Sequence, residues 1–204
     1  MSQRLRVVCE PCNNGWMSRL QSQTKPILLR LLNDNWSLTV SEQNTLAAWA
    51  TMFSMVYQQV DPDTPMFALG ERKHLLETSA PLLGWHFWLG KADLQWGSTY
   101  ANMRHAMVWH PDHKFQRMFS VGFTVGSVVI LAYFAEKSLL SPSVLNLADV
   151  FGVHKLWPSK SVISGQPKGT FNDTRLVAFT NHFARQLGHE EMVFMPYPRD
   201  VNAP

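Results

Sequence analysis

Cys9 and Cys12 are the only two cysteines in the chain, and they form a Cys-x-x-Cys pair. Where a strand turns into a helix, two thiols at this spacing can point at one centre and bind a soft metal such as zinc. A closed structural zinc site takes four ligands, so Cys9 and Cys12 supply half of one. In a cytoplasmic protein such a pair is more often metal-binding or redox-active than a structural disulfide.

Four interpretations of this cysteine pair stay open at the level of sequence. His110 and His113, the histidine pair at comparable spacing, could complete a zinc site. Two chains could instead share a site of four thiolates, which would make the protein a homodimer. A Cys-x-x-Cys that opens a helix also occurs in thioredoxin-like redox proteins, although no alternating βαβ pattern follows it here. The last interpretation is a pair of reduced thiols that only pack, and zinc content measured beside a free-thiol count separates the four.

Basic residues lie close to the cysteine pair in the sequence and are candidate contacts to nucleic-acid phosphates. They are Arg4, Arg6, Arg19, Lys25 and Arg30. The whole chain carries 18 Lys and Arg against 15 Asp and Glu, a net charge of +3, which permits a nucleic-acid partner without requiring one. Eight Trp and ten Met favour a protein partner slightly, because protein interfaces are enriched in aromatic and Met side chains.

The segment Cys9–Ser18, Cys-Glu-Pro-Cys-Asn-Asn-Gly-Trp-Met-Ser, resembles the second zinc knuckle of bacterial and phage HNH-endonuclease-like proteins. In those proteins a Cys-x-x-Cys-Asn-x-Gly-Trp-Met turn opens a helix. The likeness extends through the segment around Trp49, the hairpin around Gly126 and the stretch Leu156-Trp157-Pro158. The chain is therefore similar to the C-terminal part of such a protein, and the resemblance implies zinc at Cys9 and Cys12.

The resemblance also indicates what this chain does. Full-length relatives carry an upstream Cys-x-x-Cys and an acidic-His pair whose His is the general base on water. Only eight residues precede Cys9, too few for these parts, so we assign no catalytic residue and expect no HNH nuclease activity of the chain alone. Our hypothesis is a degenerate HNH-like protein of phage or mobile-element origin that acts by binding, as an inhibitor of a bacterial defence complex. The alternative is a metal-dependent HNH-type nuclease or nucleic-acid-binding protein, completed by other ligands or a partner chain.

Composition predicts one compact domain. The 204 residues divide into a knuckle and helical part, 1–80, and a sheet with a closing helix, 81–204. A hydrophobic content of 46% with 16% charged residues excludes a disordered chain. No uninterrupted apolar run reaches the roughly 18 residues of a membrane helix, and no apolar core of a signal peptide follows Arg4 and Arg6. We therefore expect a cytoplasmic protein with no membrane partner.

The first part of the chain has helical patterns. We expect a strand over Arg4 to Val8, then a knuckle helix that starts near Gly15 behind Asn13 or Asn14 as its N-cap. Pro26 should interrupt this helix. A second short helix then covers Lys25 to Leu32.

The next helix has the strongest pattern, with Ser41 as its expected N-cap. Its apolar residues recur at helical spacing: Leu46, Trp49, Ala50, Phe53, Val56, Tyr57 and Val60. A short helix over Glu71 to Glu77 should follow.

Beyond Pro81 the pattern changes to strands. They are expected over Trp85 to Leu89, Ala101 to Trp109, Phe115 to Phe123 and Ser127 to Phe134. Gly126 supplies a hairpin turn, and Asn172 or Asp173 caps a final helix. The predicted fold is α+β, with N-terminal helices and a zinc-knuckle remnant packed on an antiparallel sheet, plus a C-terminal helix.

Overall fold

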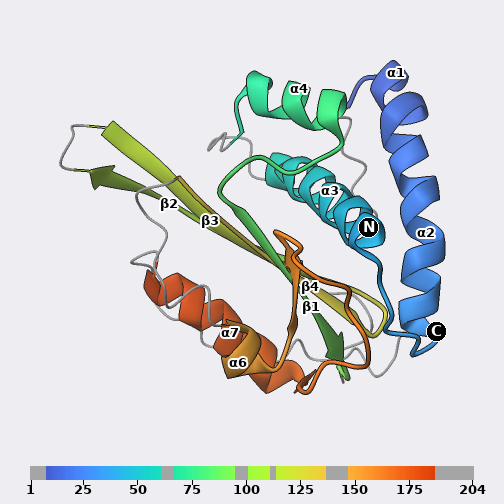
Figure 1. Ribbon diagram of the computed structural model, residues 1–204. Coiled ribbons are helices and arrows are strands. Elements are labelled where there is room, and N and C mark those ends of the chain that lie inside the picture. Colours follow the sequence, from blue (N-terminus) through green and yellow to red (C-terminus); the bar gives the residue numbers. More distant parts are fainter. Residues whose placement is uncertain (1–7, 61–66, 95–100, 111–113, 137–146, 187–204) are drawn as a thin grey trace, which may run out of the picture.

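The chain folds into three layers, with helices on both faces of one central sheet (Figure 1). The computed structural model describes residues 8–60, 67–94, 101–110, 114–136 and 147–186. The elements before the sheet are α1 (Glu10–Cys12), the π-helical turn η1 (Asn13–Met17), α2 (Ser18–Leu32), α3 (Val40–Tyr57), η2 (Gln58–Val60) and α4 (Leu69–Thr78). The elements after its main strands include α6 (Leu147–Phe151) and α7 (Asp173–Gln186).

The sheet is antiparallel along its main path, which confirms the predicted fold class. Its strands are β1 (Trp85–Ala92), β2 (Ala101–His110), β3 (Lys114–Val125), β4 (Val128–Ala135), β5 (His154–Trp157) and β6 (Thr170–Phe171). The order is β2-β3-β4-β1-β5, and the short β6 pairs with the end of β1 in the parallel sense. Gly126 forms the turn between β3 and β4 with a φ of 55°, as its position in the sequence predicted.

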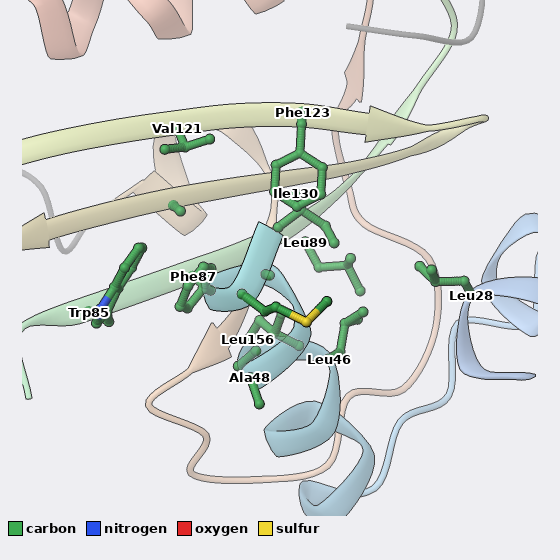
Figure 2. Close-up of a cluster of buried hydrophobic side chains, with 14 of the residues drawn as sticks. Leu28, Leu46, Ala48, Trp85, Phe87, Leu89, Val121, Phe123, Ile130 and Leu156 are labelled. Atoms are coloured by element: carbon green, nitrogen blue, oxygen red, sulfur yellow. The ribbon is translucent and has the colours of Figure 1, made fainter. Parts of the chain in front are cut away.

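One face of the sheet packs against α2 and α3. Alternate residues of β1, β3 and β4 point to this side, among them Phe87, Phe123 and Ile130. Figure 2 shows them around Leu46 of α3, with Leu28 of α2 at the side. The small side chains of Ala47, Ala48 and Ala50 are fully buried, so α3 can approach the strands closely.

The opposite face packs against α6 and α7. The other alternate residues of β1 and β4, including Trp88, Leu131 and Tyr133, are fully buried on this side. Phe151, Val153, Phe171, Leu176 and Phe179 from the later part of the chain cover them. The side chain of Asn172 accepts a hydrogen bond from the Arg175 amide at 2.9 Å, so Asn172 is the N-cap of α7, one of the two residues predicted.

An ion cluster fixes α4 to the sheet. Arg117 of β3 donates to both carboxylate oxygens of Glu71, at 2.9 and 3.0 Å, and to Glu136 at 2.8 Å. The three side chains are largely shielded, with exposed fractions of 25%, 14% and 32%. Hydrogen bonds to Glu71 and Glu136 raise the pKa of Arg117. A bidentate pair of this kind sets the orientation as well as the position of the helix.

Two helix predictions were wrong in detail. Pro26 does not interrupt the chain, because α2 continues through it to Leu32. Pro26 lies on the exposed side of α2, where water can solvate the Ser22 carbonyl that loses its backbone partner, while Leu28 and Leu31 hold the helix to the core.

The N-cap of α3 is Thr39 rather than Ser41. Thr39 and Glu42 form a capping box, in which the Glu42 amide donates to the Thr39 hydroxyl and the Glu42 carboxylate accepts from the Thr39 amide.

The predicted strand over Arg4 to Val8 falls outside the described residues except for Val8, which lies in a bend. Within the described part of the chain, no helix combines the length and the apolar character that crossing a membrane requires.

Phe119→Ala tests the packing of the first face. Phe119 is fully buried, and its ring centroid lies 4.7 to 5.1 Å from the rings of Trp85, Phe67 and Phe134. We expect this change to lower the free energy of unfolding by about 3–5 kcal/mol, measured by urea denaturation. The control Leu83→Ala, at a side chain that is 75% exposed, should change it by less than about 0.5 kcal/mol. Equal losses for the two variants would contradict this core.

Candidate functional site

The cysteine pair lies at the start of the first helix. Cys9 is the N-cap of α1, with φ −66° and ψ 150°, and Cys12 is the last residue of that helix. Pro11 lies in the first turn, where its missing N–H costs nothing, and the Asn13 amide donates to the Cys9 carbonyl at 2.9 Å. The helix therefore begins at Glu10 rather than near Gly15, and the prediction that Asn13 or Asn14 is the N-cap was wrong.

The π-helical turn after Cys12 aims Trp16 back at the pair. Gly15 has a non-helical conformation, φ −94° and ψ −111°, which bends the chain between α1 and α2. The Trp16 indole acts on the Cys12 thiol in the direction that lowers its pKa, while the ring packs against the core. Trp16 thus joins the cysteines to the helical layer.

The two thiols differ in their electrostatic environment. Cys9 is exposed and Cys12 is half-buried, and neither forms a disulfide. A hydrogen bond from the Cys12 thiol, together with one from the Cys12 amide, lowers the pKa of Cys9. The same thiol–thiol hydrogen bond, together with burial, raises the pKa of Cys12. Cys9 is therefore the thiol of the pair that ionises first and reacts first.

Beside the thiols lies an apolar cavity of about 460 Å³, which we call the knuckle groove. Its apolar walls are Val8, Cys9, Cys12, Trp16, Met17, Met52, Met55, Val56, Leu69, Leu75 and Leu76, and its polar members are Gln59, Arg72 and Lys73. The walls come from α1 with η1, from α3 and from α4. Leu69 is 80% exposed and Leu76 is 44% exposed, although both are large apolar side chains. Seven positions apart on α4, they lie on one side of that helix, at the groove.

The structure places Cys9 and Cys12 side by side but does not bring His110 to them. His110 ends β2, and Figure 1 shows that end of the β2–β3 hairpin on the opposite side of the molecule from α1. His113 lies outside the described residues. Among the residues that the structure describes, no three His, Cys, Asp or Glu side chains form a group that could hold a metal. Zinc at Cys9 and Cys12, shared between two chains or otherwise completed, stays a prediction.

The predicted nucleic-acid residues do not form one stripe where the structure describes them. Arg19 and Lys25 are exposed on α2, but a separation of six residues places them about 120° apart around the helix. Arg30 forms an ion pair with Glu42. Arg4 and Arg6 lie outside the described residues.

A second cavity, of about 590 Å³, lies beside β5 and was missed by the sequence analysis. It contains the side chains of His86, His154, Lys155 and Lys160. The available signal was Lys155, a cation inside a strand whose next residue, Leu156, is fully buried. Because successive side chains of a strand point to opposite faces, Lys155 points away from the core cluster that contains Leu156.

Comparisons of the chain with protein-family models, with curated proteins and with solved structures find no match. The resemblance to HNH-endonuclease-like proteins therefore depends on the motif residues alone.

Alkylation with iodoacetamide tests the asymmetry of the thiols. Since Cys9 is exposed and its pKa is lowered, we expect Cys9 to be modified first and its rate to rise with pH at lower values than for an ordinary cysteine. Peptide mass spectrometry locates the adduct. In the variant Cys12→Ala the rate at Cys9 should rise only at higher pH, because the alanine methyl group donates no hydrogen bond to the thiolate. Faster modification of Cys12 than of Cys9 in the unaltered chain would contradict the described arrangement.

Proposed function

We propose that this chain acts by binding a partner protein in the knuckle groove, and not by cutting nucleic acid. The observation that carries the proposal is an apolar groove beside which Leu69 and Leu76 stay 80% and 44% exposed. Large apolar side chains that gather at a concave site, instead of being scattered singly, mark interaction surfaces. Burial of such side chains by a partner is favourable by about 25 cal/mol per Å² of apolar surface.

The occupant that fits best is an amphipathic helix of the partner. The groove lies among helices and is lined by Met17, Met52 and Met55, whose flexible thioether side chains adapt to an inserted apolar side chain. A helix can place anchors spaced three and four residues apart into a groove of this kind.

The positive charge at the groove indicates that the partner helix carries acidic residues beside its apolar anchors. Arg72 and Lys73 are its charged lining residues, and no described carboxylate lines it. Lys73 pairs with Glu77 only through an exposed contact of 3.6 Å, and Arg72 donates to the Phe67 carbonyl at 3.2 Å. Exposed pairs of this type are weak, so both cations can still attract an acidic partner.

The HNH resemblance supports the same proposal in a broader sense. A protein that keeps the second knuckle of a nuclease, and whose knuckle helix forms one wall of an apolar groove, can act as an inhibitor by contact with a bacterial defence complex. A cytoplasmic location belongs to this proposal. A nucleic-acid partner is the alternative, and its binding would weaken steeply as salt rises.

The double variant Leu69→Asp/Leu76→Asp tests the groove. Capture with the unaltered chain from its native host identifies candidate partners, and the purified partner is then titrated by calorimetry. We expect the variant to bind at least about tenfold more weakly, because two carboxylates replace apolar anchors and would have to be desolvated.

Leu83→Asp is the matched control, since Leu83 is 75% exposed but does not line the groove. It should bind like the unaltered chain, and circular dichroism should show the same melting transition for all three proteins. Undiminished binding by the double variant would overturn the proposed site. Cleavage of DNA by the lone chain would overturn the proposed function as a whole.

A further inference from the structure

The second cavity contains a lysine in an unusual position. The pairing of β1 with β5 places Lys155 opposite Trp88. The Lys155 ammonium lies 3.7 Å from the centroid of the Trp88 ring, and its Nζ lies 2.9 Å from Nδ1 of His86. Trp88 is fully buried, so one side of this ammonium faces apolar protein and the other faces the cavity.

Positive charge around this lysine is not balanced locally. Within the described part of the chain, Lys155 forms no ion pair with a carboxylate, and no Asp or Glu lines the cavity. The other titratable side chains of the cavity are His86 on β1, His154 on β5 and Lys160 in the loop that follows, while Ser161 and Ser164 add hydroxyl groups. A partly buried cation without a counter-ion is costly, and a bound anion would remove that cost.

Burial changes the protonation of the pair. It lowers the pKa of Lys155 to about 7. Burial first, and then repulsion by Lys155, lower the pKa of His86 to about 4. His86 is therefore neutral at pH 7, and its Nδ1 can accept a hydrogen bond from the ammonium. A bound anion beside Lys155 would favour the charged amine and raise its pKa.

Hydrogen bonds within the protein hold the wall of the cavity. The loop after β5 is held to α3 by Gln43, which donates to the Ser161 carbonyl at 2.8 Å. Leu38 and Ile163 exchange two backbone hydrogen bonds of 3.0 Å. At the other side, a nitrogen of His154 lies 2.9 Å from the Gly165 carbonyl oxygen. A volume of about 590 Å³ is in the usual range for small-molecule sites, about 300–1,000 Å³.

We propose that this cavity, which we call the Lys155 pocket, binds a small anionic molecule through a carboxylate or phosphate group that pairs with Lys155. Lys160 adds a second positive charge from the loop. Trp88 and His86 contact the Lys155 amine on its protein side and orient it towards the cavity. The proposal is independent of the knuckle groove, because the two cavities share no lining residue.

Labelling with pyridoxal 5′-phosphate tests the proposal, because this probe carries a phosphate and an aldehyde. The neutral Lys155 amine attacks the aldehyde carbon, water leaves, and the resulting imine is reduced by borohydride to a stable secondary amine. Tryptic mass mapping then locates the label. We expect Lys155 to be labelled at least about tenfold faster than the exposed Lys73 at pH 7.5, because burial lowers the pKa of Lys155 to about 7 and leaves much of its amine neutral.

Competition shows whether the pocket holds an anion. Inorganic phosphate or citrate should slow labelling at Lys155 and leave Lys73 unchanged, and the better competitor distinguishes phosphate from carboxylate recognition. Without competitor, the rate at Lys155 should rise through pH 7, and with competitor this rise should move to higher pH.

Variants complete the test. Lys155→Met keeps the apolar stem and should leave the corresponding peptide unlabelled in a chain with the same circular dichroism spectrum. Lys160→Gln should leave Lys155 reactive but weaken protection by the anions. This variant tests the anion site while Lys155 itself stays unchanged. Labelling of Lys155 no faster than of Lys73, or rapid labelling that neither anion slows, would overturn the proposed anion site.

Discussion

The structure depends on a central strand pair that is apolar on both faces. All eight residues of β4 are buried, and its neighbour β1 contributes Trp85, Phe87 and Leu89 to one face and Trp88 to the other. Such strands expose a large apolar surface unless a layer of helices covers each side. The chain supplies α2 and α3 before these strands and α6 and α7 after them (Figure 1). The N-terminal and C-terminal parts are thus separate layers on one shared sheet, and the sheet links them.

Both candidate sites lie where this three-layer packing ends. The knuckle groove is formed where α4 and the cysteine helix meet α3 on the side away from the strands, and Arg117 determines how α4 lies there through its pair with Glu71. The Lys155 pocket is formed at the edge strand β5, where a loop returns to α3. Helices hold most of the lining of the knuckle groove, while β1, β5 and a loop hydrogen-bonded to α3 hold that of the Lys155 pocket, which reduces the entropy lost when a ligand binds. The two proposed binding sites therefore lie at separate places and share no lining residue.

Local patterns predicted much of the fold, and contacts between distant segments explain what they missed. The aromatic and β-branched residues of β3 and β4 and the glycine at 126 carry their own structural signals, so the hairpin was predicted closely. Continuation of α2 through Pro26 depends on which side of the helix meets the core, and no local rule gives that. The capping box of Thr39 with Glu42 was present in the sequence, but the neighbouring Ser41 competes for the same role. The pair of His86 with Lys155 joins residues 69 positions apart, through a β1–β5 register interrupted by a bulge, and could not be predicted from spacing.

The cysteine pair thus lies in the wall of the larger, apolar knuckle groove. Our central claim is that this groove, rather than a metal held by the thiols, binds the partner. The most direct measurement is the affinity of the variant Cys9→Ser/Cys12→Ser for the captured partner, in the presence and absence of a zinc chelator. We predict an affinity within about twofold of the unaltered chain under both conditions, since the substitutions change the groove little. Loss of binding in this variant, or on chelation of the unaltered chain, would show that a thiolate–metal centre forms the interface and would contradict the claim.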